Sequence, residues 1–274
     1  MQADTPRQTL TDLFRDHGQD LPLGLSVALI AADERPEIEV DSLLGRLDDL
    51  AAEIPIRGGA PLFESTARLH MSLFTELGLR GDEQTYGDPR NSCLDQVLDR
   101  RMGLPILLSV VYIEVARRLD ISVDGIGFPG HFLVSPHDAD TRFFVDPFHQ
   151  GRILTREHLQ LRLMDILGDP DPDGVALEQF TRPATTASIL VRINNNLKRS
   201  WASQNDLEGA LRAVERNLVL APDELDEQRD RGMILAELGR LDQAIDQLER
   251  YLEHELSGWD QARVTAIIDV LRRR

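Results

Sequence analysis

Gly127-Phe128-Pro129-Gly130-His131-Phe132-Leu133-Val134 is the stretch that says most about the fold, together with Phe144-Val145-Asp146-Pro147-Phe148 downstream. Each stretch contains a short apolar run, and a polar segment, 135–140, lies between them. This pattern predicts two paired strands joined by a turn. Asp146 follows His131 by fifteen residues. Strand pairing would place its carboxylate beside the imidazole, which holds a histidine in one tautomer and one orientation.

A long apolar segment, 106–119, precedes these strands and predicts a helix. It follows directly on Gly103-Leu104-Pro105. Proline suits the first turn of a helix, because its missing N–H has no partner within the helix there. A helix start that faces a His–Asp pair is where a papain-like enzyme carries its thiol. Pro105 has no nucleophilic atom, so acyl transfer from this position is chemically excluded.

Four segments share their order and spacing with a known fold: Gly103-Leu104-Pro105, Ala116-Arg117-Arg118-Leu119-Asp120-Ile121, Gly130-His131-Phe132-Leu133-Val134 and Val145-Asp146-Pro147-Phe148. They resemble a transglutaminase-like core, in which Gly-x-Cys opens a helix that ends in Arg-x-Leu-Gly-Ile, before a strand His and a strand Asp. Counted back from Leu119, this spacing puts the Cys position on Pro105. The resemblance therefore implies an α+β, papain/transglutaminase-like core in which His131 and Asp146 occupy the catalytic positions and the thiol is missing.

Further segments narrow the resemblance: Asp88-Pro89-Arg90-Asn91-Ser92, Leu98-Asp99-Arg100-Arg101-Met102-Gly103-Leu104-Pro105 and Gly127-Phe128-Pro129-Gly130-His131-Phe132. They are similar to a bacterial family that joins a transglutaminase-like region to C-terminal tetratricopeptide repeats. Its members are often named after a regulator of invasion genes. The resemblance to this family implies no defined reaction. The resemblance covers roughly residues 25–256.

The C-terminal third contains an internal repeat. Five positions recur 34 residues later, which is the tetratricopeptide period: Trp201, Asn205, Ala210, Val214 and Asn217 correspond to Leu235, Gly239, Ala244, Leu248 and Tyr251. Two such units leave apolar faces that need covering, so we expect this module to dock onto the first domain. The segment 262–271 predicts a capping helix.

The domain organisation follows from these signals. Residues 1–167 are predicted to form a helical N-terminal segment plus the transglutaminase-like core, with helices near 62–77, 94–102 and 156–167. Prolines, glycines and alternating aspartates predict a linker over 168–184. Residues 185–274 form the all-α, tetratricopeptide-like module with its capping helix.

Composition limits the classes of function. The formal net charge of −17 disfavours binding to nucleic acid or anionic lipid, because like charges repel. A single cysteine excludes an internal disulfide framework and suits a reducing compartment. The N-terminal Met1-Gln2-Ala3-Asp4-Thr5-Pro6-Arg7 lacks a basic start before an apolar stretch, so we expect a cytoplasmic protein.

Two residues are candidates to replace the missing nucleophile. Cys93 lies near the start of the predicted helix 94–102, where the helix dipole lowers a thiol pKa, although a packing role is favoured. Ser109 lies one turn beyond Pro105 and would need contact with His131 to be activated. Helix serines more commonly bond to the backbone carbonyl one turn earlier.

Other interpretations of the same residues remain open. His131 and Asp146 also fit a purely structural pair that pins two strands. With His149 they could act as metal ligands, but the spacing is unspecific and we predict no metal and no cofactor. Asp169, Asp171 and Asp173 alternate as in calcium loops, but the intervening prolines favour a solvated linker. Phe128 and Gly130 are predicted to form a turn whose backbone N–H groups line a ligand cleft, with Pro105 opposite.

Together these features favour a non-catalytic transglutaminase-like protein that acts as an interaction module. A protein or peptide partner would bind through the repeats or the cleft. The alternative is a hydrolase or acyltransferase that uses Cys93 or Ser109 with His131 and Asp146.

Overall fold

The computed structural model describes residues 5–57, 59–168, 175–254 and 258–273. The chain divides into two compact units, Met1–Ile193 and Asn194–Arg274. The division falls inside helix α9 (Thr186–Ser203), beyond the segment 168–184 that we expected to be a linker. None of the described helices is long and apolar enough to cross a lipid bilayer.

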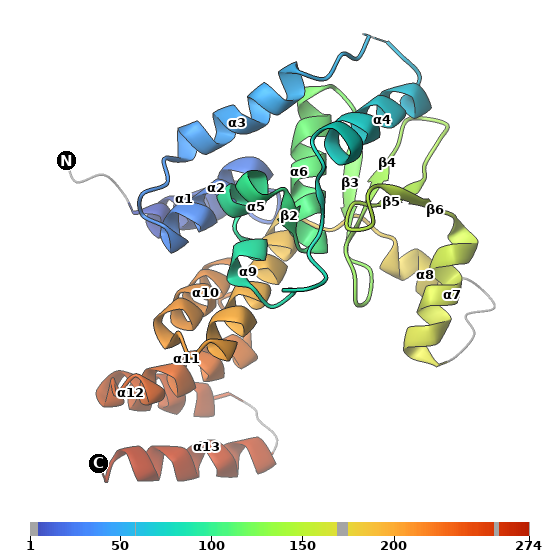
Figure 1. Ribbon diagram of the computed structural model, residues 1–274. Helices are drawn as coiled ribbons and strands as arrows, with labels where there is room; N and C mark the ends of the chain where they lie inside the picture. The colour runs from blue at the N-terminus through green and yellow to red at the C-terminus, as the bar shows by residue number, and fades with distance from the viewer. Residues whose placement is uncertain (1–4, 58, 169–174, 255–257, 274) are drawn as a thin grey trace. The chain divides into compact units, whose positions relative to one another are not determined.

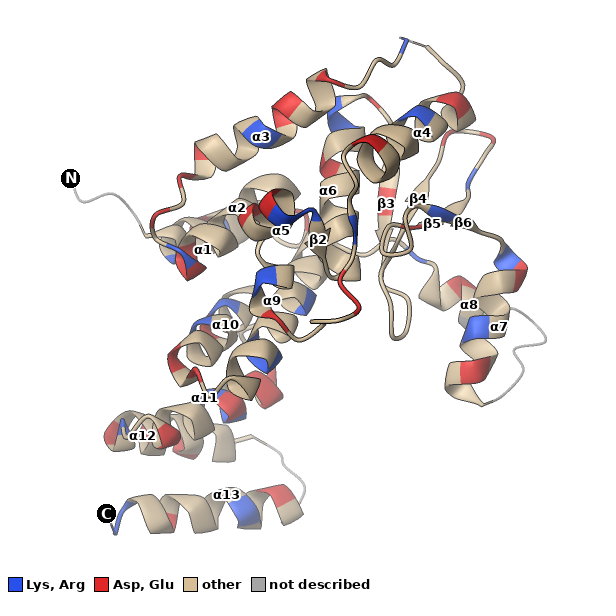
Figure 2. Ribbon diagram, in the orientation of Figure 1, with Lys and Arg blue, Asp and Glu red and all other residues tan. Residues whose placement is uncertain are grey.

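Helix α6 (Pro105–Arg118) is the centre of the first unit (Figure 1). It begins with Pro105 at its first helical position, as predicted, and its side chains are buried on nearly every face. A helix that is apolar on all faces is stable only when other elements pack against all of those faces. Helices α2 and α3 and strands β3 and β4 pack against it and supply that cover. Its charged residues, Glu114, Arg117 and Arg118, lie towards its C-terminal end (Figure 2).

A four-stranded antiparallel sheet holds the two quoted stretches of sequence. Its strands run in chain order: β3 (Val123–Ile126), β4 (Leu133–Pro136), β5 (Phe144–Asp146) and β6 (Arg152–Leu154). Val134 on β4 pairs with Val145 on β5, so the predicted pairing of the two stretches is confirmed. A separate parallel pair is formed by β1 (Arg80–Gly81) and β2 (Met102–Gly103).

Helices make up the rest of the first unit. In chain order they are α1 (Pro6–His17), α2 (Leu23–Glu34), α3 (Val40–Ala52), α4 (Leu62–His70), the π-helix η1 (Met71–Glu76), the 3-10 helix η2 (Pro89–Ser92), α5 (Leu94–Arg100), α7 (Arg156–Leu167) and α8 (Val175–Phe180). The helix expected over 62–77 is present but changes from α to π at Met71. The helix expected over 156–167 has those bounds, and Thr155 caps it.

Part of the expected linker is ordered structure. Helix α8 lies within it, and Pro183 forms an isolated bridge to Ile126 of β3. The first turns of α9 also belong to the first unit, where Ile189 and Ile193 are buried. The interpretation of Asp169, Asp171 and Asp173 as solvated linker concerns residues outside the described ranges.

The regular structure described in the second unit is helical: the end of α9, then α10 (Leu207–Leu220), α11 (Leu225–Glu237), α12 (Leu241–Leu252) and α13 (Gly258–Leu271). Ala210 and Ala244, the equivalent positions of the 34-residue repeat, are both fully buried. Close approach of paired helices explains the small residues. A side chain at Gly209 would lie 2.6 Å from the Trp201 ring, and one at Gly232 would lie 2.6 Å from Leu248.

Candidate functional site

His131 and Asp146 form the centre of the candidate site. Nε2 of His131 lies 2.7 Å from Oδ1 of Asp146, so the predicted hydrogen bond is present. Asp146 is the last residue of β5, whereas His131 lies in the turn two residues before β4 and not on the strand itself. That position follows from Gly130, whose φ of 67° is a left-handed conformation, and from the His131 N–H, which donates to Phe128 O.

The side chain of Asp146 is fully buried, and it is surrounded by hydrogen-bond donors and positively charged groups. Nδ1 of His149 lies 2.8 Å from Oδ2, and Nη1 of Arg162 on α7 lies 3.5 Å from the same oxygen. Burial alone raises the pKa of the Asp146 carboxyl. The hydrogen bonds and charges of His131 and His149 outweigh burial and lower that pKa to about 2. The carboxylate is therefore ionised at neutral pH.

The ionised carboxylate decides which ring nitrogen of His131 carries the proton. A carboxylate only accepts hydrogen bonds, so Nε2 of His131 must donate to Asp146. In the neutral ring Nδ1 is then left as the acceptor, and it forms no hydrogen bond with any residue that the structure describes. The pair thus has the geometry of a base and its orienting carboxylate.

Arg192 and Phe148 fix the position of the His131 segment. Nη2 of Arg192 donates to the His131 carbonyl oxygen at 2.6 Å, and its guanidinium lies 5.4 Å from the centroid of the Phe132 ring. The Phe148 ring stands edge-on to His131, with 6.0 Å between the ring centroids. Gly81 allows this, because a Cβ there would lie 2.5 Å from the Phe148 ring.

Both residues proposed as nucleophiles are buried. Ser109 is fully buried on α6, and its Oγ has no hydrogen-bond partner among the described residues, so it is not hydrogen-bonded to His131. It does not bond to the carbonyl one turn earlier either, contrary to the common pattern. Cys93 is buried at the N-cap of α5, without a side-chain capping bond. Pro105 is also buried.

The turn 128–131 differs from the cleft wall that the sequence led us to expect. The Phe128 side chain is buried in a core cluster with Leu133, Leu159 and Leu177, so it does not face a ligand. The backbone N–H groups of Phe128 and His131 are used within the turn, on the carbonyl oxygens of Ile126 and Phe128. The turn therefore orients His131 and offers neither of these donors to a ligand.

Three residues of the site carry the atom types that bind metal ions. His131, Asp146 and His149 offer ligand atoms that all lie within 4.8 Å of one another. Imidazole nitrogens and a carboxylate oxygen are a common donor set for zinc. Both imidazoles are already hydrogen-bonded to the carboxylate, however, and Arg162 brings a positive charge to it. This charge disfavours a second cation, so the geometry supports a closed polar network more than a metal site.

Comparison with known proteins agrees with this architecture. The family model of the transglutaminase-like superfamily matches residues 41–195. The chain belongs to the transglutaminase-like superfamily. A tetratricopeptide repeat model matches residues 197–272, which confirms the predicted repeats.

Bacterial relatives share both parts of the chain. A UPF0162 protein of Xylella fastidiosa is 41% identical over 239 residues, which are 86% of this chain and 84% of that protein. A UPF0162 protein of Vibrio cholerae is 32% identical over 70% of this chain and 69% of its own length. The UPF0162 protein YchA of Escherichia coli K12 is 29% identical over 80% of each chain. The predicted bacterial family with its α+β core and helical repeats is thus confirmed.

Sequence reasoning missed two arginines of this site in the transglutaminase-like unit. Arg162 reaches Asp146 from α7, and Arg192 reaches the His131 carbonyl from α9. Neither lies in a recognisable motif, and both are brought in by packing. His149 was considered only as a metal ligand. Its position three residues after Asp146, across the Pro147 turn, was the available signal.

Proposed function

We propose that this transglutaminase-like protein does not catalyse acyl transfer and acts as a module that binds a protein or peptide partner. The supporting observation is Pro105 at the first position of α6, where the superfamily resemblance implies the catalytic cysteine. His131 keeps its orienting carboxylate, but Pro105 offers no thiol or hydroxyl for this base to activate.

The tetratricopeptide module supports the second half of the proposal. Tetratricopeptide repeats stack helix pairs into extended surfaces that bind other proteins. A retained His–Asp pair in a folded site is compatible with recognition, since its polar groups can orient a bound peptide segment without reacting with it. We infer an intracellular, cytoplasmic location from the single cysteine and the composition of the chain.

The alternative, a hydrolase or acyltransferase, requires Cys93 or Ser109 to act with His131. Ser109 forms no hydrogen bond with His131 in the described structure, and the Cys93 side chain is buried at the N-cap of α5. An enzyme of this type needs a hydrogen bond between its nucleophile and His131, and Ser109 does not form one. This requirement makes the alternative the weaker candidate.

A pair of measurements separates the two functions. The first offers the purified full-length protein a glutamine-containing peptide and a primary amine, and measures ammonia release in the wild type, Cys93→Ser and Ser109→Ala. We expect no release above the protein-free blank. Turnover by the wild type that either substitution abolishes would establish the enzyme and overturn the proposal.

The second measurement addresses binding. Affinity capture from the native lysate is run in parallel with the wild type, His131→Ala and Arg57→Ala, followed by cross-linking to locate the contact. Arg57 is exposed and serves as a surface control far from the His131 turn in sequence. We expect a partner that cross-links within residues 197–272, or one lost with His131→Ala and kept with Arg57→Ala. Recovery of nothing beyond a bead control would refute a stable partner.

A further inference from the structure

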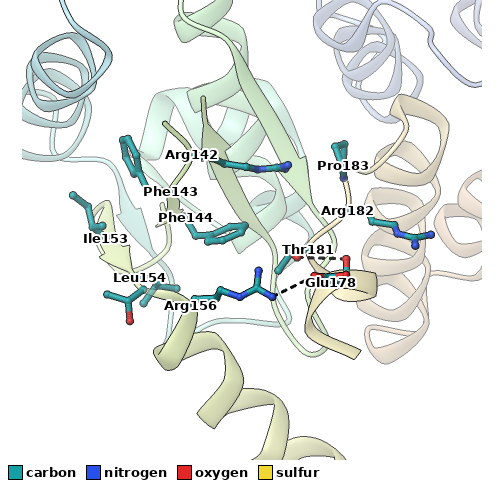
Figure 3. A pocket seen from close by; sticks show the side chains of 11 residues that line it. Arg142, Phe143, Phe144, Ile153, Leu154, Arg156, Glu178, Thr181, Arg182 and Pro183 are labelled. Atoms are coloured by element: carbon teal, nitrogen blue, oxygen red, sulfur yellow. Dashed lines mark hydrogen bonds and ion pairs between the residues drawn. The ribbon is translucent and has the colours of Figure 1, made fainter. Parts of the chain in front are cut away.

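The first unit has a pocket that contains none of the residues of the His131–Asp146 site. This pocket has a volume of about 530 Å³ and lies between strands β5 and β6 on one side and the segment 178–183 on the other (Figure 3). Pockets of ~300–1,000 Å³ hold small organic ligands in proteins. The residues that matter to its chemistry are Arg142, Phe144, Leu154, Arg156, Glu178 and Pro183.

One part of the pocket lining is apolar. The half-buried Phe144 ring projects into the space from β5, with the exposed Pro183 opposite, and the core residue Leu154 on β6 supports it from behind (Figure 3). An aromatic face flanked by aliphatic groups is a platform for the apolar body of a ligand. This apolar surface alone would accept any small apolar molecule.

Two arginines make the pocket favour an anionic ligand. The guanidinium groups of Arg142 and Arg156 extend into the same space on either side of the Phe144 ring (Figure 3). Arg142 is held in place by the Ser135 hydroxyl, which accepts from Nε at 2.9 Å, and by a partly exposed ion pair of 3.2 Å with the Asp124 carboxylate. These cations gather in a protein whose net charge is −17, so the pocket is locally complementary to an anion.

Arg156 already has a carboxylate near it, but the pair is loose. Its Nη2 lies 3.7 Å from Oε1 of Glu178 on α8, and both side chains are more than half exposed. Such an exposed pair is worth only about 0–1 kcal/mol. Glu178 therefore occupies the place of an anionic group without holding Arg156 firmly, and a better-placed carboxylate can displace it.

The N-terminus of α7 adds to the same effect. Arg156 is the first residue of this helix, directly after the cap residue Thr155, and both residues line the pocket. The positive end of a helix dipole favours an anion near its first turn. The arginines and the helix start thus attract negative charge to one place beside an apolar wall.

We propose that this pocket binds an amphipathic carboxylate, with its apolar body between Phe144 and Pro183 and its carboxylate at Arg156 and Arg142. Glu178 is the intramolecular stand-in that the ligand's carboxylate displaces. The site is separate from the His131–Asp146 network, so the two proposals stand or fall independently.

Phenylpropionate is a suitable probe, and its uncharged amide is the matched control of equal size. Binding to the full-length protein is measured by ligand-observed NMR titration, and by chemical shifts of the protein's own amides to locate the site. We expect the acid to bind about 10-fold more tightly than the amide. Added salt should weaken binding of the acid and leave the amide unchanged.

Three exposed positions in the pocket make the test specific. Arg156→Gln should weaken binding of the acid by about 2- to 5-fold. Glu178→Gln should strengthen it by about 2- to 5-fold, because it removes the competing carboxylate. Arg182→Gln is the control: Arg182 lines the rim, but its side chain points away from the space (Figure 3), so its loss should leave binding within about 2-fold.

The tighter binding expected for Glu178→Gln cannot be caused by misfolding, since a damaged fold does not bind the acid more tightly. Equal affinity of the acid and the amide, or weaker binding in Glu178→Gln, would overturn the proposal. A further arm uses a tripeptide that ends in phenylalanine with a free or an amidated C-terminus. Competition by the free form alone identifies a peptide C-terminus as a source of the carboxylate, whereas no competition identifies small organic acids.

Discussion

Replacing Asp146 by asparagine tests the central polar network most directly. The substitution keeps the size of the side chain and removes its charge. One amide oxygen can still accept a hydrogen bond from one imidazole. The amide NH₂ must then face the other imidazole or Arg162, where the carboxylate now accepts. The variant loses the charge-assisted bonds and keeps the packing.

The pKa of Asp146 sets the magnitude of the expected loss. That pKa is about 2 in the folded protein, against an ordinary value of 3.8. One pKa unit corresponds to about 1.4 kcal/mol, so ionised Asp146 stabilises the fold by about 2.5 kcal/mol at neutral pH. His149 and Arg162 are partly exposed and regain water when the charge is removed, which keeps the loss from growing much larger.

The sign of the pH dependence follows from the lowered pKa. A carboxyl whose pKa is lowered by folding contributes fully above its unfolded value of about 4, and the contribution disappears as the pH falls towards about 2. The free energy of unfolding of Asp146→Asn should therefore lie about 2.5 kcal/mol below that of the wild type at about pH 7. The gap should narrow steadily below about pH 4.

Urea unfolding followed by circular dichroism measures this difference, and hydrogen exchange of peptides from β4 and β5 assigns it to the first unit. Tryptophan fluorescence is not suitable, because Trp201 and Trp259 both lie in the second unit. Asp99→Asn is the control, since Asp99 forms an exposed ion pair with Arg46 and should change stability by less than about 1 kcal/mol. A loss in Asp146→Asn no larger than in this control, or one unchanged at low pH, would refute the reasoning.

Three further predictions concern the helices. Pro105→Cys in a Cys93→Ser background should give a thiol whose pKa lies below the usual value of about 8.5, measured by the pH dependence of alkylation; a profile like that of an unperturbed thiol would contradict the placement of Pro105. Ser109→Ala should leave stability unchanged or raise it by up to about 1 kcal/mol, because the buried hydroxyl has no partner in the described structure; a clear loss in urea unfolding would show that the hydroxyl is used. Lys198→Met should destabilise the second unit by about 2–3 kcal/mol in fluorescence-monitored unfolding, because it leaves the buried carboxylate of Glu227 unpaired, and an unchanged transition would be evidence against this buried ion pair.

The local features of this protein could be predicted because each depends on residues close in sequence. Pro105 at a helix start and the bounds of α7 follow from capping and turn chemistry within a few residues. The hydrogen bond between His131 and Asp146 follows from one hairpin, in which register and loop length decide which residues meet. The 34-residue period identified the repeats, since each unit repeats the same helix-to-helix contact.

Tertiary packing decided the rest of the site. The sequence carried no sign that Arg162 and Arg192 would converge on the His131 hairpin, because their helices are placed by distant apolar faces and not by neighbouring residues. Phe128 was expected in a cleft, but α7 and α8 cover it and make it part of the core.

The segment 168–184 shows most clearly what could not be predicted from the sequence. Its prolines and glycines predict a linker, and this composition is all that local chemistry can report. Folding nevertheless places Glu178 on a helix beside Arg156 and sets Pro183 against β3, and a pocket is formed. Helix starts, the hairpin of His131 and Asp146, and the repeats were determined by the sequence alone, because short-range sterics and hydrogen bonding govern them. The partners of each charged side chain were decided only by the tertiary structure, because they depend on which surfaces bury one another.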